Sequence, residues 1–182
     1  AASGGAFSWL ILEYFSNKKL SLLGLLSGVL SGLVTITPAA GFVNYLSAYI
    51  ISMIGGIACY FVVNYIKEKL RYNDTLDAFG IHGVGGVIGA ILTGVFQSHK
   101  VNKDILDGLI YTGHLHTIWI QCIAVVVVVV YSIIITFIIG KTLSIFMSLA
   151  TTVEEDMTGL DQLVHGEKAY FYGELNKLHK RY

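Results

Sequence analysis

The chain contains four long runs of residues without an acidic or basic side chain, and its charges lie outside these runs. The runs cover residues 20–43, 45–66, 78–97 and 117–140. Each is close in length to the roughly 20 residues that a helix needs to cross the hydrocarbon core of a bilayer. Only 13% of all residues are charged, against about 25% in an average soluble domain. The sequence therefore predicts a membrane protein with several spans.

The spans are predicted to be helices rather than strands. Six consecutive valines, Val125–Val130, would favour a strand in a soluble protein, but here they lie inside a run of helix-spanning length. A lone strand leaves its backbone unsatisfied in lipid, and a transmembrane barrel needs an alternating polarity that this chain lacks. The predicted fold class is therefore an all-α integral membrane protein with four whole and one partial transmembrane helices. The whole helices are expected at about 20–43, 45–66, 76–97 and 117–140, and the partial helix at 1–14.

The two ends of the chain differ from the middle. Residues 1–14 are apolar but too short to span a bilayer, no basic stretch precedes them, and Glu13 follows early. We therefore expect no signal peptide but a helix cut at its start, which makes the chain an incomplete fragment. Residues 1–150 form the predicted transmembrane region, and the polar residues 151–182 form a C-terminal tail.

The basic residues predict the orientation, because lysine and arginine favour the cytoplasmic side. Connectors one and three carry such residues, namely Lys18, Lys19, Lys67, Lys69 and Arg71. We therefore expect a multi-pass protein whose C-terminal tail is cytoplasmic. The opposite loop, residues 98–116, also holds two lysines and counts against this orientation, although Asp104 and Asp107 offset them.

His82 is the one ionisable residue inside a predicted whole span. Its helix is expected to begin near Asp74, a good N-cap residue, and Asp77 fits a variant of the capping box. Both aspartates are interpreted as caps or as the entrance of a path. His82 would then lie about 12 Å along the helix, near the middle of the bilayer. An ionisable residue at that depth is costly and indicates a functional site.

The chemistry of a buried histidine suits a small nitrogen compound. Desolvation disfavours the charged form, and a neutral imidazole offers one donor and one acceptor. It can accept a hydrogen bond from an N–H group or relay a proton without holding a fixed charge. The alternative is a histidine that bonds a neighbouring helix for packing alone, and spacing does not exclude it.

Other features indicate packing more than chemistry. Gly24, Gly28 and Gly32 recur every four residues and predict close helix contacts, and Pro38 is expected to end or bend its helix. The two cysteines, Cys59 and Cys122, are interpreted as buried free thiols.

Several function classes find no support in the sequence. No CxxC or HExxH motif is present, and the alternating pair His114 and His116 is weak evidence for a metal. No nucleophile, base and orienting residue form a constellation, so we expect neither an enzyme nor a cofactor nor a bound metal. A net charge of zero gives no indication of a nucleic-acid partner.

Three segments carry a resemblance to a known family. They are Gly32 to Val43 (GLVTITPAAGFV), Asp77 to Gly86 (DAFGIHGVGG), and a tail segment with Gly159-Leu160-Asp161, His165-Gly166-Glu167 and Ala169-Tyr170. In order and spacing these segments resemble the Amt/MEP ammonium transporter family, and the resemblance covers essentially the whole chain. The His-Gly-Val-Gly-Gly run is more similar to Amt than to the related Rh proteins.

The resemblance implies a specific architecture and mechanism. Family members have eleven helices in two inverted halves and form homotrimers in the cell membrane. Each subunit has a hydrophobic path lined by two histidines, along which ammonium or methylammonium is deprotonated and passed as the neutral amine. His82 matches the second histidine of that pair, whose partner would precede Ala1. Ala78 is expected to line the path on its cytoplasmic side, although the family often has valine there.

The resemblance also implies a regulatory role for the tail. The expected regulatory residues are Gly159, Leu160, Asp161, His165, Gly166 and Glu167, and they would pack against the cytoplasmic loops. The basic connector from Lys67 to Arg71 is a candidate surface for this contact, and a PII-type signal protein is a candidate partner. The alternative function is an Amt-like ammonium sensor with little net flux. A sensor usually carries an added signalling domain, and this tail is too short for one.

Overall fold

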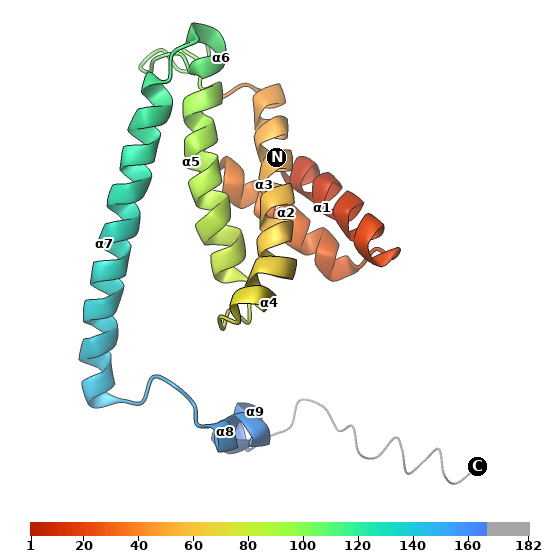
Figure 1. Cartoon of the computed structure of the whole chain (residues 1–182), viewed down its shortest axis with the longest axis vertical. Coiled ribbons are helices and arrows are strands. Elements are labelled where there is room, and N and C mark those ends of the chain that lie inside the picture. The colour runs from red at the N-terminus through yellow and green to blue at the C-terminus, as the bar shows by residue number, and fades with distance from the viewer. Residues whose placement is uncertain (167–182) are drawn as a thin grey trace. The chain divides into compact units, whose positions relative to one another are not determined.

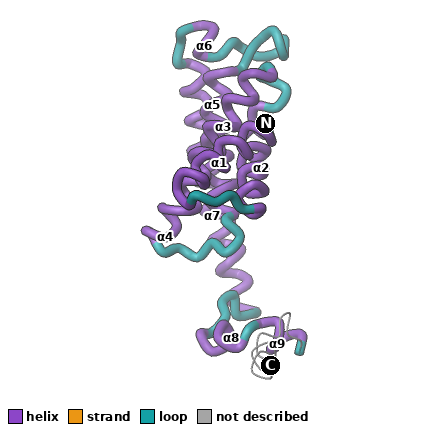
Figure 2. Tube along the Cα trace, turned by 90° about the vertical axis from the view of Figure 1, so that its right-hand side faces the viewer, coloured by secondary structure: helices purple, strands orange, loops and turns teal. Residues whose placement is uncertain are grey.

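The computed structural model describes residues 1–166, and all regular structure in that range is helical (Figure 2). Four segments are long and apolar enough to cross a membrane, namely Leu22–Ala39, Tyr45–Leu70, Phe79–Phe96 and His116–Phe146. The prediction of an all-helical protein with four apolar spans is thereby confirmed. The first helix, α1, runs over Ala2–Asn17.

The remaining elements follow in chain order. They are α2 (Leu22–Ile36), the 3₁₀ turn η1 (Thr37–Ala39), α3 (Tyr45–Phe61), the π-helical turn η2 (Val62–Ile66), α4 (Lys67–Leu70), the π-helical turn η3 (Phe79–Gly83), α5 (Val84–Phe96), α6 (Leu109–Thr112), α7 (His116–Phe146), α8 (Val153–Thr158) and α9 (Leu160–His165). The chain divides into two compact units, residues 1–130 and 131–182, which are described separately.

In the first unit, α1, α2, α3 and α5 pack side by side (Figure 1). The loop around α4 lies at one end of this group, and α6 lies at the opposite end. The aromatic residues Trp9 of α1 and Tyr60 of α3 are buried between their helices. Their ring centroids are 5.3 Å apart at an interplanar angle of 86°, the edge-to-face arrangement that aromatic pairs favour.

Glycines bring α1 and α2 into close contact. Gly24, Gly28 and Gly32 are all buried on α2. A Cβ atom on Gly28 would lie 2.7 Å from the Cβ atom of Trp9, and one on Gly32 would lie 3.0 Å from the Cα atom of Gly5. A larger side chain at either position would push the helices apart, which confirms the close packing that the four-residue spacing predicts.

The end of α2 also agrees with the prediction from the sequence. The α-helix stops at Ile36, and the 3₁₀ turn Thr37–Ala39 that follows contains Pro38. Proline lacks the amide hydrogen that would continue the helix, so the expected bent end is present. One turn earlier, the hydroxyl of Thr35 donates a hydrogen bond of 2.7 Å to the carbonyl of Ser31 and is fully buried.

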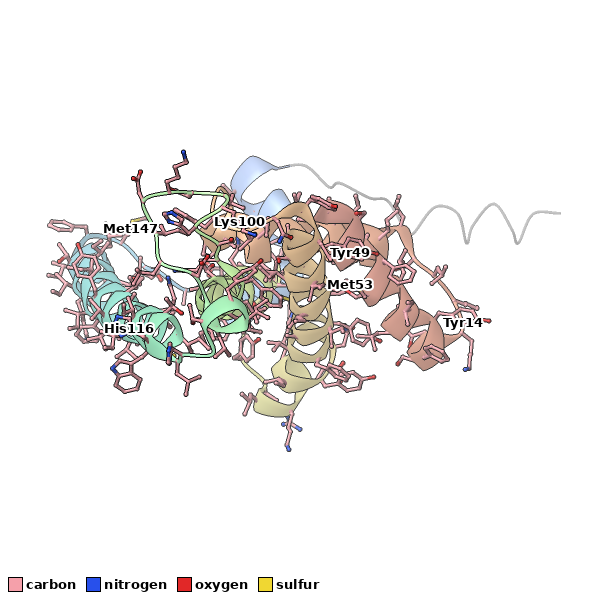
Figure 3. All side chains as sticks on the ribbon, turned by 90° about the horizontal axis from the view of Figure 1, so that it is seen from above. Tyr14, Tyr49, Met53, Lys100, His116 and Met147 are labelled. Atoms are coloured by element: carbon pink, nitrogen blue, oxygen red, sulfur yellow. The ribbon has the colours of Figure 1, made fainter. Side chains whose placement is uncertain are left out.

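The last long helix, α7, is apolar on all sides, and side chains stand out around it (Figure 3). A helix of this composition suits a lipid environment. It extends to Phe146, beyond the expected end at residue 140. Lys141 does not end the helix, because a long basic side chain can keep its stem on apolar surface while the charge reaches water.

The second unit contains two short helices after α7. Thr152 and Glu155 form a reciprocal capping box at the start of α8, in which Glu155 N donates to Thr152 Oγ1 and Thr152 N donates to Glu155 Oε2 at 3.2 and 2.7 Å. Of the predicted tail residues, Gly159 follows α8 with a positive φ of 91° and Leu160 begins α9. Asp161 and His165 lie in α9, Gly166 has a φ of 69°, and Glu167 lies outside the described residues.

Candidate functional site

The helix that carries His82 begins later than the sequence suggests. Its first helical residue is Ala78 rather than a residue near Asp74. Asp77, directly before it, has a left-handed backbone with a φ of 55° and cannot belong to the helix. His82 therefore lies about 6 Å along the axis from the helix start, at about 1.5 Å per residue. The expected value of about 12 Å is wrong for this reason.

Asp74 lies four residues before Ala78 and contacts the start of the helix. Its carboxylate accepts hydrogen bonds from the backbone amides of Ala78, Phe79 and Gly80 at 2.9, 3.0 and 3.2 Å. The first amides of a helix have no partner inside the helix, so these contacts satisfy three of them. A single carboxylate thus closes the end of the helix that bears His82.

Asp77 does not take part in a capping box, and that prediction is wrong. Its Oδ1 atom lies 2.6 Å from the Nζ atom of Lys67 at the start of α4. The left-handed turn at Asp77 directs the side chain away from the new helix and toward the preceding one. Sequence reasoning placed Lys67 only in a basic connector. The signal that could have revealed the pair is the opposite charge of Lys67 and Asp77 at the two ends of one short loop.

His82 lies within the π-helical turn Phe79–Gly83. This turn packs against α2 and the π turn η2, and Gly80 approaches the side chain of Val63 in η2 so closely that an added Cβ atom would lie 2.8 Å from it. The Sγ atom of Cys59 lies 3.7 Å from the carbonyl oxygen of Ile81, to which the thiol donates. Turns of this kind occur often at functional sites, because they change the direction in which a side chain points.

The two sides of the helix formed by η3 and α5 differ. Gly85, Gly89 and Thr93 are buried, and Gly85 and Gly89 adjoin Thr35 of α2. On the other side, Ala78 and His82 are exposed. A Cβ atom added to Gly86 would meet no other atom within 4 Å. We call Ala78, His82 and Gly86, which are spaced by four residues, the open face of α5.

The imidazole of His82 has no hydrogen-bond partner among residues 1–166. The alternative in which His82 serves as a packing residue requires a bond to a neighbouring helix, and the described part of the chain supplies none. A neutral imidazole on this face keeps one donor and one acceptor free. Chemically it can accept a hydrogen bond from an N–H group and exchange a proton with it.

The remaining predicted residues lie elsewhere. His114 and His116 flank the start of α7, beyond α6, and Figure 3 shows His116 there. Within the described residues, no three His, Cys, Asp or Glu side chains are grouped in a way that could hold a metal ion. The tail residues from Gly159 onward belong to the second unit, so their contact with the Lys67 to Arg71 connector stays a prediction.

Comparison with known proteins gives consistent matches over nearly the whole chain. Residues 1–170 match the Ammonium Transporter Family. An ammonium transporter of Bacillus subtilis is 47% identical over 170 residues, which are 93% of this chain and 42% of the relative. The chain thus spans less than half the length of that curated relative.

Solved structures give the same result. The crystal structure of Saccharomyces cerevisiae Mep2 matches with a TM-score of 0.70 and 37% identity, over 75% of this chain and 31% of that chain. A structure described as a sensor Amt protein matches with a TM-score of 0.75 and 29% identity, over 90% of this chain and 39% of that chain.

Proposed function

The chain belongs to the ammonium transporter family, and from this premise we propose that it is part of a protein that carries ammonium across a membrane. Because the chain spans 42% of its Bacillus relative, we propose that it supplies the second half of an eleven-helix transporter. Transmembrane helices from the remainder of that protein would then pack against the helices described above.

The open face of α5 supports a transport path at His82. An exposed histidine within an apolar span is costly against lipid. We therefore propose that this face is covered by other helices of the full-length protein rather than by lipid. The small residues Ala78 and Gly86 leave room beside the imidazole, and a narrow path suits a substrate the size of ammonium or methylammonium.

The proposed mechanism follows from the chemistry of the imidazole. Moving a bare cation through an apolar path costs much more than moving a neutral amine. Ammonium would therefore transfer a proton to the histidine pair, pass His82 as ammonia, and take a proton back on the far side. His82 would accept a hydrogen bond from the substrate, and a second histidine from the other half would face it.

The family also guides our proposals for assembly and location. We propose a homotrimer in the plasma membrane, with the C-terminal tail in the cytoplasm on the side of the Lys67 to Arg71 connector. The tail from Gly159 to Glu167 would pack against cytoplasmic loops, and a PII-type protein would be a regulatory partner. Charge reversal at Lys69 and Arg71 tests the tail contact, because an unchanged transport rate would argue against it.

An ammonium sensor is a second candidate, and the similarity to the sensor Amt structure favours it. Net flux separates the two functions. We expect proteoliposomes that contain the full-length wild-type protein to accumulate radiolabelled methylammonium above protein-free liposomes. Saturable binding of methylammonium without accumulation would instead support the sensor.

A further inference from the structure

We infer that the ion pair between Lys67 and Asp77 is a positioning device for His82. It fixes the turn from which the His82 helix begins, and so sets the direction in which the imidazole points. Lys67 and Asp77 are positioning residues in this inference, because neither is required to touch the substrate. The inference relies on the proposed function only for the role of His82 in transport.

The ion pair links the two elements at the ends of the loop between residues 67 and 77. Lys67 begins α4, Asp77 directly precedes the His82 helix, and their charged atoms lie 2.6 Å apart. Each side chain is 28% exposed, so the pair is partly shielded from water. A second contact spans the same loop, where the rings of Tyr72 and Phe79 lie edge to face with centroids 5.8 Å apart.

Three contacts hold Asp77 in place, two through its backbone and one through its side chain. Its amide donates to the carbonyl of Asp74 at 3.2 Å, and its carbonyl accepts from the amide of Ile81 at 2.9 Å. Its left-handed φ of 55° is one that aspartate tolerates better than most residues, but at an energetic cost. The side-chain bond to Lys67 is the third contact and helps to retain this unfavourable conformation.

The direction of His82 depends on the turn that follows Asp77. Ile81, whose amide bonds the Asp77 carbonyl, directly precedes His82 within the π-helical turn. A π turn holds one more residue than an α-helical turn, so a change to α-helix shifts residues within and beyond the turn by up to one position. One residue corresponds to a rotation of about 100° around the axis. Loss of the ion pair would thus allow His82 to turn away from the open face of α5.

Lys67 is well placed to restrain this rearrangement. It follows a second π-helical turn, Val62–Ile66, and its amide donates to the carbonyl of Val62. The side chain of Val63, in the same turn, packs against Gly80. The two π turns therefore meet through Val63 and Gly80, and the ion pair ties their ends together.

Four single variants of the full-length protein, together with the double variant Lys67→Ala/Asp77→Asn, test the inference. Lys67→Ala removes the cation, and Asp77→Asn removes the anion while keeping a residue type that tolerates a left-handed backbone. Lys67→Arg keeps the charge and serves as the conservative variant. Lys19→Ala removes an exposed lysine outside this loop and is the control for a simple loss of charge.

Two measurements report on position independently of transport. Amide hydrogen exchange across residues 79–83 reports on the turn, and the rate of carbethoxylation of His82 by diethyl pyrocarbonate reports on the imidazole. We expect Lys67→Ala and Asp77→Asn to change both rates at least threefold, with the double variant no further changed than either single one. Lys67→Arg and Lys19→Ala should match the wild type.

Methylammonium uptake then connects position to function. We expect both disruptive variants to reduce uptake at least threefold and Lys67→Arg to restore most of it. Unchanged exchange and carbethoxylation in both variants would overturn the inference, even if the wild type transports methylammonium. If both disruptive variants change the two rates but the wild-type protein shows no uptake, the proposed function is overturned. The positioning of His82 by the ion pair is then still supported.

Discussion

The thiol of Cys59 donates to the carbonyl of Ile81, with 3.7 Å between Sγ and the oxygen. The donor lies in the last turn of α3, and the acceptor directly precedes His82 in the π-helical turn. Cys59 is fully buried, and its sulfur also adjoins Gly85. A buried side chain of α3 thus supports the turn that carries the candidate site.

This contact predicts that Cys59→Ala destabilises the protein. The variant removes a buried sulfur and its hydrogen bond, which we expect to cost about 1–2 kcal/mol. Thermal unfolding of the full-length protein in detergent measures the change. Cys122→Ala is the control at a half-buried position of α7 and should change the stability less than Cys59→Ala does. Equal stability of the two variants would show that the Cys59 contact contributes little.

The close approach of α5 to α2 predicts a strong effect at Gly89. An added Cβ atom would collide with the backbone carbonyl of Thr35, which has little freedom to move. We expect Gly89→Ala to lower the free energy of unfolding by about 1–3 kcal/mol. Gly140→Ala is the control, because an added Cβ atom there meets nothing within 4 Å. A Gly89→Ala protein as stable as this control would contradict the close approach of α5 to α2.

Asp74 should stabilise the His82 helix through its three backbone contacts. Asp74→Ala leaves the amides of Ala78, Phe79 and Gly80 without these acceptors, and loss of such a cap costs about 1–2 kcal/mol. Hydrogen exchange of these three amides should rise in the variant. Asp104→Ala, in a distant loop, is the control. Unchanged protection at residues 78–80 would mean that the helix start is held by other contacts.

Some of this structure could be predicted from the sequence because its causes are local. A long uncharged run must form a helix in lipid to satisfy its own backbone, so the four spans followed from composition alone. The bent end of α2 at Pro38 followed from one missing amide hydrogen. His82 was singled out because an ionisable residue within an apolar span is rare.

Other features depend on contacts between distant residues and could not be predicted in this way. Asp77 has a residue type that suits a capping box, but its pairing with Lys67 and its left-handed backbone give it another role. The π turn at His82 packs against α2 and η2 and accepts a hydrogen bond from Cys59 of α3, and no local pattern encodes these contacts. The start of the helix was therefore placed four residues too early, and the distance of His82 from that start was overestimated.

The open face of α5 predicts that Gly86→Leu blocks transport without preventing folding. A Cβ atom added at Gly86 has no neighbouring atom within 4 Å, but a leucine side chain would fill the proposed path one turn beyond His82. We expect methylammonium uptake to fall at least tenfold in a protein that still assembles as wild type by gel filtration. Normal uptake by a correctly assembled Gly86→Leu protein would place the path elsewhere.

The most direct test of the account compares methylammonium uptake by the full-length wild-type protein and by His82→Ala, with His114→Ala as the control outside the spans. Expression and assembly are checked for each variant before uptake is measured. We predict that His82→Ala loses uptake or loses its selectivity against other monovalent cations, while His114→Ala transports normally. Unchanged rate and selectivity in a correctly inserted His82→Ala protein would show that His82 is not on the path and would contradict the proposed mechanism.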